Sequence, residues 1–216
     1  MFQLDLPIII AILFFILLVI VIFYNRFYKV GKKNEITLVK GPTKFNEEFE
    51  KSFKLNELIQ NKDSIFLDNK GYGITLKWEM YISNNSGSKY YNSGFNKLKN
   101  IMSIGESPQI YYHPKRGYLS FIFKYLDNPF YSHYPEIKLE NVPQQTWNKF
   151  VLVMDGRHVR LYLGGNLVKS ITLPNVLVLD INEVSVGKKD NNFLGLIKNM
   201  VLFPYPMNQI EVKDIL

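Results

Sequence analysis

Acidic side chains come nearest, by type and spacing, to a catalytic pattern in this chain. Hydrolysis of a glycosidic bond uses two carboxyl groups, and retaining chemistry needs them roughly 5 Å apart, as same-face neighbours on a strand are. Glu48 and Glu50 stand at i and i+2, but in a segment where no strand is clearly predicted. The remaining acidic pairs are more widely spaced: Glu136 with Glu140, Asp180 with Glu183, and Glu211 with Asp214.

Histidine, serine and cysteine add no second catalytic pattern. His113, His133 and His158 are scattered along the chain, and no serine lies in a nucleophile elbow. The chain has no cysteine, which excludes disulfides, thiolate metal sites and cysteine nucleophiles. We therefore expect a protein that is not an enzyme and that has no catalytic residues.

Two short runs of Asp and Asn could supply oxygen ligands to a calcium ion. They are Asp127-Asn128 and Asp190-Asn191-Asn192. A calcium site needs more carboxylates than either run offers, and Asx side chains commonly fill turns by bonding nearby backbone. We expect no metal site and no cofactor, with calcium as the alternative.

An aromatic loop, DNPFYSHYP, is the candidate contact surface. Phe130, Tyr131 and Tyr134 lie close together in it, between predicted strands, where their rings could stack on a sugar or on a protein partner. Packing of one or two of these rings in the core is the alternative.

The elements that would position these residues are β-strands. Short β-branched or aromatic runs follow one another, separated by Gly, Pro, Asn or Asp. The predicted strands are ITLV, SIFLD, YGITLKWEMYI, KNIMSIG, QIYYH, YLSFIFKY, EIKL, KFVLVMD, HVRLYLG, LVKSITL, NEVSVG and LGLIKNMVLF. This pattern predicts an all-β fold of two packed antiparallel sheets. FNEEFEKSFKLNELI fits either a short helix or an irregular edge.

The stretch 150–173 predicts a three-stranded meander. Apolar residues recur there with a period of two, and Asp155-Gly156 and Gly165-Asn166 interrupt them where hairpin turns need positive φ angles. Trp147 opens the first of these strands, and we expect it to be largely buried. Near the end of the chain, Asn208 and Glu211 predict a capped short helix.

The N-terminus predicts a membrane anchor. Residues 6–24 form an apolar run without charge, which as a helix would span roughly 28 Å. A cleaved signal peptide is the alternative, but it needs a basic start and a small-residue cleavage site. The predicted organisation is an anchor at 1–25, a basic linker at 26–34 and a sandwich at 35–216.

Basic residues follow the anchor directly, at Arg26, Lys29, Lys32 and Lys33. These residues are expected to contact anionic headgroups and to remain on the cytoplasmic side. The predicted topology is therefore single-pass, with the N-terminus crossing the membrane and the sandwich in the cytosol, beyond the reach of enzymes that would glycosylate Asn84.

The net charge of +7 does not indicate nucleic-acid binding. Residues 34–216 hold 22 basic and 18 acidic residues, because the cluster after the anchor accounts for the rest of the excess. No usual DNA- or RNA-binding motif is present.

The segment from Trp147 through VLVMDGRHVRLYLGGNLVKS resembles the laminin G-like branch of the concanavalin A-like lectin/glucanase superfamily. Its pattern is a tryptophan, a strand, Asp155-Gly156, a strand ending in Leu-Tyr and a turn with Gly165. Downstream, Phe193 and Gly195 match the closing segment of the family. The resemblance implies a jelly-roll sandwich. The hydrolytic members carry Glu-x-Asp-x-x-Glu on one strand, a run that this sequence lacks.

An anchor joined to this domain, with the segment SPQIYYHP, resembles proteins of large double-stranded DNA viruses. The resemblance implies a structural or adaptor protein, a minor capsid component that links an internal virion membrane to the capsid shell. Its partners would be the lipid bilayer and other capsid or membrane proteins. The alternative function is a glycan-binding, lectin-like adhesion protein.

Overall fold

The computed structural model describes residues 7, 14–22, 35–45, 50–54, 73–83, 98–125, 134–177, 183–188 and 193–216. The chain divides into two compact units, Met1–Glu35 and Ile36–Leu216. In the first unit, residues 14–22 are helical and their apolar side chains are mostly exposed. Among the described residues, no helix has the length and apolar character needed to cross a membrane. The anchor at residues 6–24 therefore stays a prediction.

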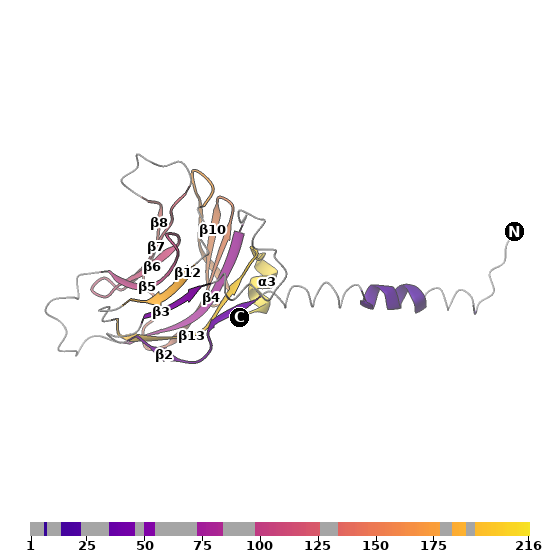
Figure 1. Cartoon of the computed structure of the whole chain (residues 1–216), viewed down its shortest axis with the longest axis horizontal. Coiled ribbons are helices and arrows are strands. Elements are labelled where there is room, and N and C mark those ends of the chain that lie inside the picture. The colour runs from indigo at the N-terminus through magenta and orange to yellow at the C-terminus, as the bar shows by residue number, and fades with distance from the viewer. Residues whose placement is uncertain are drawn as a thin grey trace. The chain divides into compact units, whose positions relative to one another are not determined.

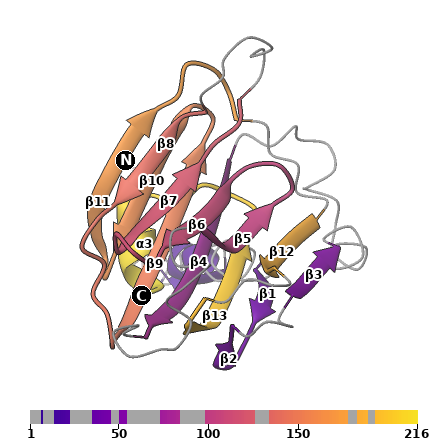
Figure 2. The same cartoon turned by 90° about the vertical axis from the view of Figure 1, so that its left-hand side faces the viewer.

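The second unit is built from two antiparallel sheets (Figures 1 and 2). Sheet A has the strand order β1-β13-β4-β9-β10-β11, and β2 also pairs with β13. Its strands are β1 (Ile36–Val39), β2 (Thr43–Lys44), β4 (Gly73–Ile82), β9 (Trp147–Asp155), β10 (His158–Leu163), β11 (Asn166–Thr172) and β13 (Gly195–Phe203). The last strand of the chain therefore lies between the first strand and β4.

Sheet B has the strand order β3-β12-β5-β6-β7-β8. Its strands are β3 (Glu50–Lys54), β5 (Lys99–Ile104), β6 (Gln109–His113), β7 (Tyr118–Ile122), β8 (Glu136–Leu139) and β12 (Glu183–Gly187). The predicted two-sheet antiparallel sandwich is confirmed. The predicted strand SIFLD lies outside the described residues, and the ambiguous segment contributes the edge strand β3.

The core lies between the sheets and is formed by alternate residues of the long strands. Trp78 is fully buried and stacks on Phe150, with ring centroids 5.1 Å apart and planes at 14°. The ring centroid of Phe121 lies 6.3 Å from that of the same indole, so sheet B contributes to this cluster. Burial of these large rings supplies much of the hydrophobic free energy that holds the sheets together.

The predicted meander is confirmed, because β9, β10 and β11 pair in sequence. Its turns are Gly156-Arg157 and Gly164-Gly165, so the predicted turns Asp155-Gly156 and Gly165-Asn166 were each displaced by one residue. Asp155 stays in the ladder, opposite His158. Positive φ angles at all three turn glycines, +58°, +56° and +85°, explain why glycine is used there.

The predicted C-terminal helix is confirmed as α3 (Gln209–Asp214). The Asn208 side chain accepts hydrogen bonds from the N–H groups of Ile210 and Glu211, and the Glu211 carboxylate accepts the Asn208 N–H at 2.7 Å. This capping box satisfies donors that a short helix would otherwise leave unpaired. Val212 then packs on the outer face of sheet A, against a second apolar cluster that includes Val151.

Candidate functional site

The outer face of sheet B carries rows of polar side chains. In each strand the alternate residues point into the core, as Tyr112 and Leu119 do, so their neighbours face outward. The pairing register places these outward residues in rows. One row runs from Ser185 through Ser103 to Gln109, and the next from Asn100 through Tyr111 and Ser120 to Lys138.

Hydrogen bonds between neighbouring strands fix the side chains of this face. The Ser103 and Ser185 hydroxyl oxygens lie 2.8 Å apart, and the Tyr111 hydroxyl donates to the Gln109 amide oxygen at 2.7 Å. All four residues are half-buried. The result is a preorganised array of hydroxyl and amide groups beside an aromatic ring, a surface chemistry suited to polar, uncharged ligands.

Charged groups gather where this face reaches the edge strand β8. The Ser120 hydroxyl donates to Glu136 at 2.6 Å, and Lys138 pairs with the same carboxylate at 3.2 Å. The Lys138 ammonium also lies 5.7 Å from the centroid of the Tyr118 ring. Glu136 therefore already has a hydrogen bond from a hydroxyl group and an ion pair with an ammonium group.

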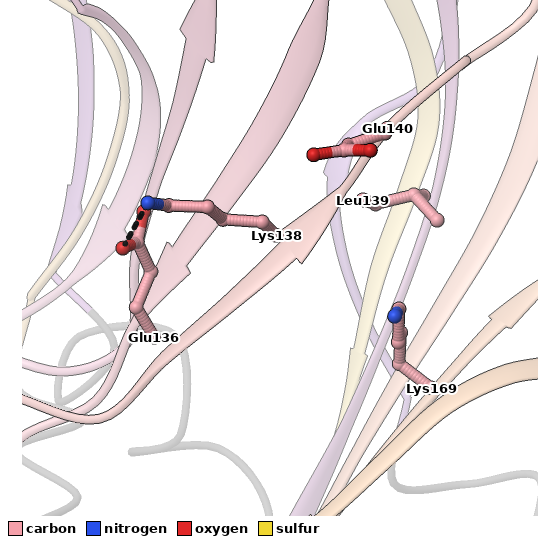
Figure 3. A pocket seen from close by; sticks show the side chains of 5 residues that line it. All are labelled: Glu136, Lys138, Leu139, Glu140 and Lys169. Atoms are coloured by element: carbon pink, nitrogen blue, oxygen red, sulfur yellow. Dashed lines mark ion pairs between the residues drawn. The ribbon is translucent and has the colours of Figure 1, made fainter.

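A pocket of about 520 Å³ opens at this edge, in the size range of small-ligand sites (Figure 3). It is lined by Glu136, Lys138, Leu139 and Glu140 from β8 and its end, and by Lys169 from β11. Both are edge strands, one from each sheet, so the pocket lies where an edge of sheet A meets an edge of sheet B. Glu136 and Glu140 both line this pocket, with a lysine from each strand, but their carboxylates lie apart (Figure 3).

The carboxylates of Glu136 and Glu183, on two strands of sheet B, lie too far apart for glycoside hydrolysis. Glu136 on β8 and Glu183 on β12 are four strand positions apart, which corresponds to roughly 19 Å. Glycosidases need their two carboxyl groups within about 10 Å. Within the described ranges, no group of three or more His, Asp or Glu side chains could hold a metal ion.

His113 faces outward at the end of the same surface. Its ring lies 5.1 Å from that of Tyr118. Partial burial and the charges of Arg116 and Lys115 outweigh a backbone hydrogen bond and lower the pKa of His113 below its usual value. The lower pKa favours the neutral imidazole, so His113 adds mainly an aromatic group to the face.

Most of the predicted contact residues lie outside the described part of the chain. This holds for Phe130, Tyr131, the basic residues Arg26, Lys29, Lys32 and Lys33, and the two Asp/Asn runs at 127–128 and 190–192. Tyr134 is described, and its side chain is 47% exposed. The face of sheet B was missed from the sequence, although the alternation in QIYYH and YLSFI signals an outward polar half in each strand.

Trp147 is partly buried, as the sequence predicted, but it does not lie in the core. Trp147 is half-buried on the outer face of sheet A, whereas Trp78 is the tryptophan of the core. The reason is strand parity, since the neighbouring Phe150 points inward and the side chain at 147 must point outward with Lys149.

Phe193 and Gly195 pack closely against each other. Phe193 is buried, with its ring centroid 5.2 Å from those of Phe45 and Tyr112. A Cβ atom at position 195 would lie 2.4 Å from the Phe193 ring and 2.5 Å from the Tyr81 carbonyl oxygen. Glycine is required here because two groups of the core occupy the space of a side chain.

Comparison with known families agrees with this architecture. A laminin G-type model, described as the concanavalin A-like lectin/glucanases superfamily, matches residues 59–213. The chain belongs to this superfamily. The resemblance predicted from the Trp147 segment is thereby confirmed at the level of the family, and no curated protein matches the chain.

Several solved structures share the fold of this superfamily member. The receptor binding domain of botulinum neurotoxin D aligns with a TM-score of 0.62 and 13% identity, covering 84% of this chain and 47% of that one. The receptor binding domain of the type G neurotoxin gives a TM-score of 0.58 and 12% identity, covering 84% and 43%. This chain therefore spans less than half the length of these neighbours, and the likeness concerns the fold.

Proposed function

We propose that this chain is a non-enzymatic, single-pass membrane protein whose sandwich attaches a second protein to the membrane from the cytosolic side. The proposal rests on two features together: an uncharged apolar segment, residues 6–24, and a sandwich whose fold also occurs in domains named as receptor binding domains. The helical part of that segment exposes Phe14 by 66% and Phe15 by 68%. A bilayer would cover such side chains.

The orientation follows from the basic residues after the apolar segment. Arg26, Lys29, Lys32 and Lys33 would remain at the cytoplasmic leaflet, where anionic lipids attract them. In a virus that takes an internal membrane from its host, a cytosolic sandwich would come to face the capsid shell. The partner we propose is therefore a capsid or membrane protein, which would make this chain a minor component of the virion.

The geometry of sheet B supports a binding role rather than catalysis. Glu136 is held by Ser120 and Lys138, and Glu140, the other carboxylate of the pocket, is four residues further along the chain, roughly 13 Å away in an extended strand. A fixed carboxylate with two partners is poorly placed to exchange a proton with a substrate.

Protease treatment of sealed microsomes carrying the full chain tests the topology. Digestion of the sandwich, with Asn84 unmodified, is the expected result. Full protection together with a glycan on Asn84 would place the sandwich in the lumen and overturn the adaptor proposal. The amount of chain that resists carbonate extraction measures the anchor separately, because peripheral proteins are released by that treatment.

Glycan binding is the second candidate function, and the face of sheet B is the observation that favours it. Ser103, Ser185, Gln109 and Tyr111 offer hydroxyl and amide groups beside an aromatic ring, as sugar recognition requires. The neighbours with a similar fold are named as receptor binding domains, which agrees with a role in recognition.

A glycan array probed with and without calcium separates the two candidates. Specific binding that Tyr111→Ala abolishes would establish the lectin function and displace the adaptor proposal. The matched control is Tyr81→Ala, which removes a half-buried tyrosine from the opposite sheet. Absence of binding on the array leaves the adaptor as the function to pursue by crosslinking to partner proteins.

A further inference from the structure

The outer face of sheet A is divided into a covered and an open half. Helix α3 covers the half around Val151 and Val153. The open half lies toward the other end of the same strands, where the register places Tyr81 opposite Trp147 and Glu79 opposite Lys149. We call the residues Lys44, Tyr81, Trp147, Lys149 and Lys198 the basic aromatic patch.

Pairing in sheet A shows that the patch residues share one face. Leu196 of β13 lies opposite both Lys44 and Tyr81, and Lys198 lies opposite Glu79. Directly paired residues in antiparallel strands point to the same side of a sheet. The patch therefore extends across β2, β13, β4 and β9.

Contacts within the patch hold its aromatic and basic groups together. The Lys198 ammonium lies 4.1 Å from the centroid of the Trp147 ring, and the Trp147 and Tyr81 centroids are 5.8 Å apart. Lys198 also pairs with Glu79 at 3.3 Å. Glu79 is only 8% exposed, so the surface presented to solvent is mainly aromatic and basic.

The half-buried state of Trp147 is not explained by packing of the core. Trp78 and Phe150 fill the space between the sheets, and Trp147 lies on the other side of sheet A. Lys44 and Lys149 are exposed, and the Lys149 ammonium also donates to the Leu216 main-chain oxygen at 2.5 Å. Exposed lysines around a partly exposed indole and a tyrosine form the combination that occurs where proteins meet a membrane surface, because such rings are amphipathic.

The length of the connecting chain limits what this patch can reach. Eleven residues separate Tyr24 from Ile36, and they can span at most about 40 Å when fully extended. The chain enters the sandwich at β1, which belongs to sheet A. A bilayer holding the N-terminal segment would therefore be present at high effective concentration beside this sandwich.

We propose that the basic aromatic patch docks on the anionic lipid surface of the membrane that holds the N-terminal segment. This inference rests on the membrane anchor of the proposed function. Trp147 and Tyr81 would lie at the level of the headgroups, while Lys44, Lys149 and Lys198 would contact anionic lipid. Each lysine near such a surface raises the binding constant roughly fivefold. Docking by sheet A would leave the polar face of sheet B turned away from the membrane and accessible to a partner.

Tryptophan fluorescence of the full chain in nanodiscs tests the docking. The discs contain phosphatidylserine and either brominated or ordinary phosphatidylcholine. The chain has two tryptophans, and Trp78 is fully buried, so contact quenching by bromine reports on Trp147. We expect brominated lipid to lower the emission of the wild-type chain and to leave that of Trp147→Phe unchanged.

Charge variants separate docking from mere proximity to the disc. Lys44→Gln and Lys149→Gln, alone and combined, should reduce quenching, as should raising the salt concentration. The matched control is Lys138→Gln, an exposed lysine on sheet B, which should not alter quenching.

Three outcomes would overturn the inference. Equal quenching of the wild type and Trp147→Phe would show that Trp147 does not touch lipid, although the anchor holds. A second outcome is that an acidic protein or a nucleic acid, at saturating concentration and without lipid, shields Trp147 from solvent, while brominated lipid does not quench it. That result would assign the patch to this partner. A chain that does not co-elute with the discs would overturn the proposed anchor, and the docking with it.

Discussion

Glu79 of β4 connects its carboxylate to two side chains of β13. It accepts a hydrogen bond from the Asn199 amide at 2.8 Å and pairs with Lys198 at 3.3 Å. Asn199 has a φ of +49° at the β13 bulge, and its N–H donates to the Lys40 carbonyl oxygen at 3.2 Å. Burial would raise the pKa of Glu79, but the hydrogen bonds from Asn199 and Lys198 and the nearby lysine charges outweigh it and lower that pKa.

Replacement of this carboxylate should make stability less dependent on pH. Because the folded pKa of Glu79 lies below the unfolded one, its contribution is present above the unfolded pKa and is lost as pH falls through the folded pKa. Glu79→Gln should cost about 1–3 kcal/mol at pH 7 and progressively less below pH 4. Urea denaturation across this range measures the difference. A loss that is equal at pH 7 and pH 3 would contradict the prediction, and Glu106→Gln is the control because its ion pair is exposed.

The two tryptophans provide a second test at the scale of single residues. Trp78→Ala should cost about 3–5 kcal/mol, since it would leave a cavity beside Phe150 and Phe121. Trp147→Ala should cost clearly less, because its ring is half-buried on the outer face. Thermal or urea denaturation of the two variants in parallel would reveal the order. Equal losses would mean that Trp147 contributes to stability as a core residue does.

At the scale of elements, β13 depends on a glycine that allows close approach of Phe193 and β4. Gly195→Ala would place a Cβ atom 2.4 Å from the Phe193 ring and 2.5 Å from the Tyr81 carbonyl oxygen. We expect a loss of about 1–3 kcal/mol from overpacking. Gly41→Ala is the matched control, since no atom lies within 4 Å of its added Cβ. Similar unfolding midpoints for the two variants would show that the neighbouring groups shift enough to accommodate a methyl group at position 195.

Helix α3 depends on the Asn208 side chain that caps its N-terminus. Asn208→Ala would remove acceptors for the N–H groups of Ile210 and Glu211 and should cost about 1 kcal/mol. Gln209→Ala, at an exposed helix position, should be nearly neutral. Unfolding midpoints of the two variants give the comparison, and indistinguishable values would mean that packing of Val212 alone holds the helix.

At the scale of the whole molecule, Ile36–Leu216 forms a compact unit with its own core. We expect residues 36–216 to fold without the N-terminal segment, because both buried apolar clusters of the sandwich are made of residues from that unit. Far-ultraviolet circular dichroism should be dominated by β-structure, with one cooperative unfolding transition. A spectrum dominated by helix, or the absence of a transition, would show that the first 35 residues are needed for folding.

The sequence by itself determined most of the described strands, the meander and the cap of α3. These features depend on local properties: side chains alternate with a period of two, turns need glycine at positive φ, and Asn208 with Glu211 forms a box within four residues. The family was accessible for the same reason, since its motif is contained in one hairpin and its neighbours. None of these properties requires knowledge of which distant segments meet.

Only the tertiary structure decided which strands pair and which face each residue occupies. The run FVLVM is apolar at every position because Phe150 faces the core while Val151 and Val153 face α3, so alternation alone could not place Trp147. The position of β13 between β1 and β4, and the meeting of β8 with Lys169 of β11, join residues far apart in the chain. Such pairings are set by the packing of whole sheets rather than by local propensity, and the polar face of sheet B and the basic aromatic patch both arise from them.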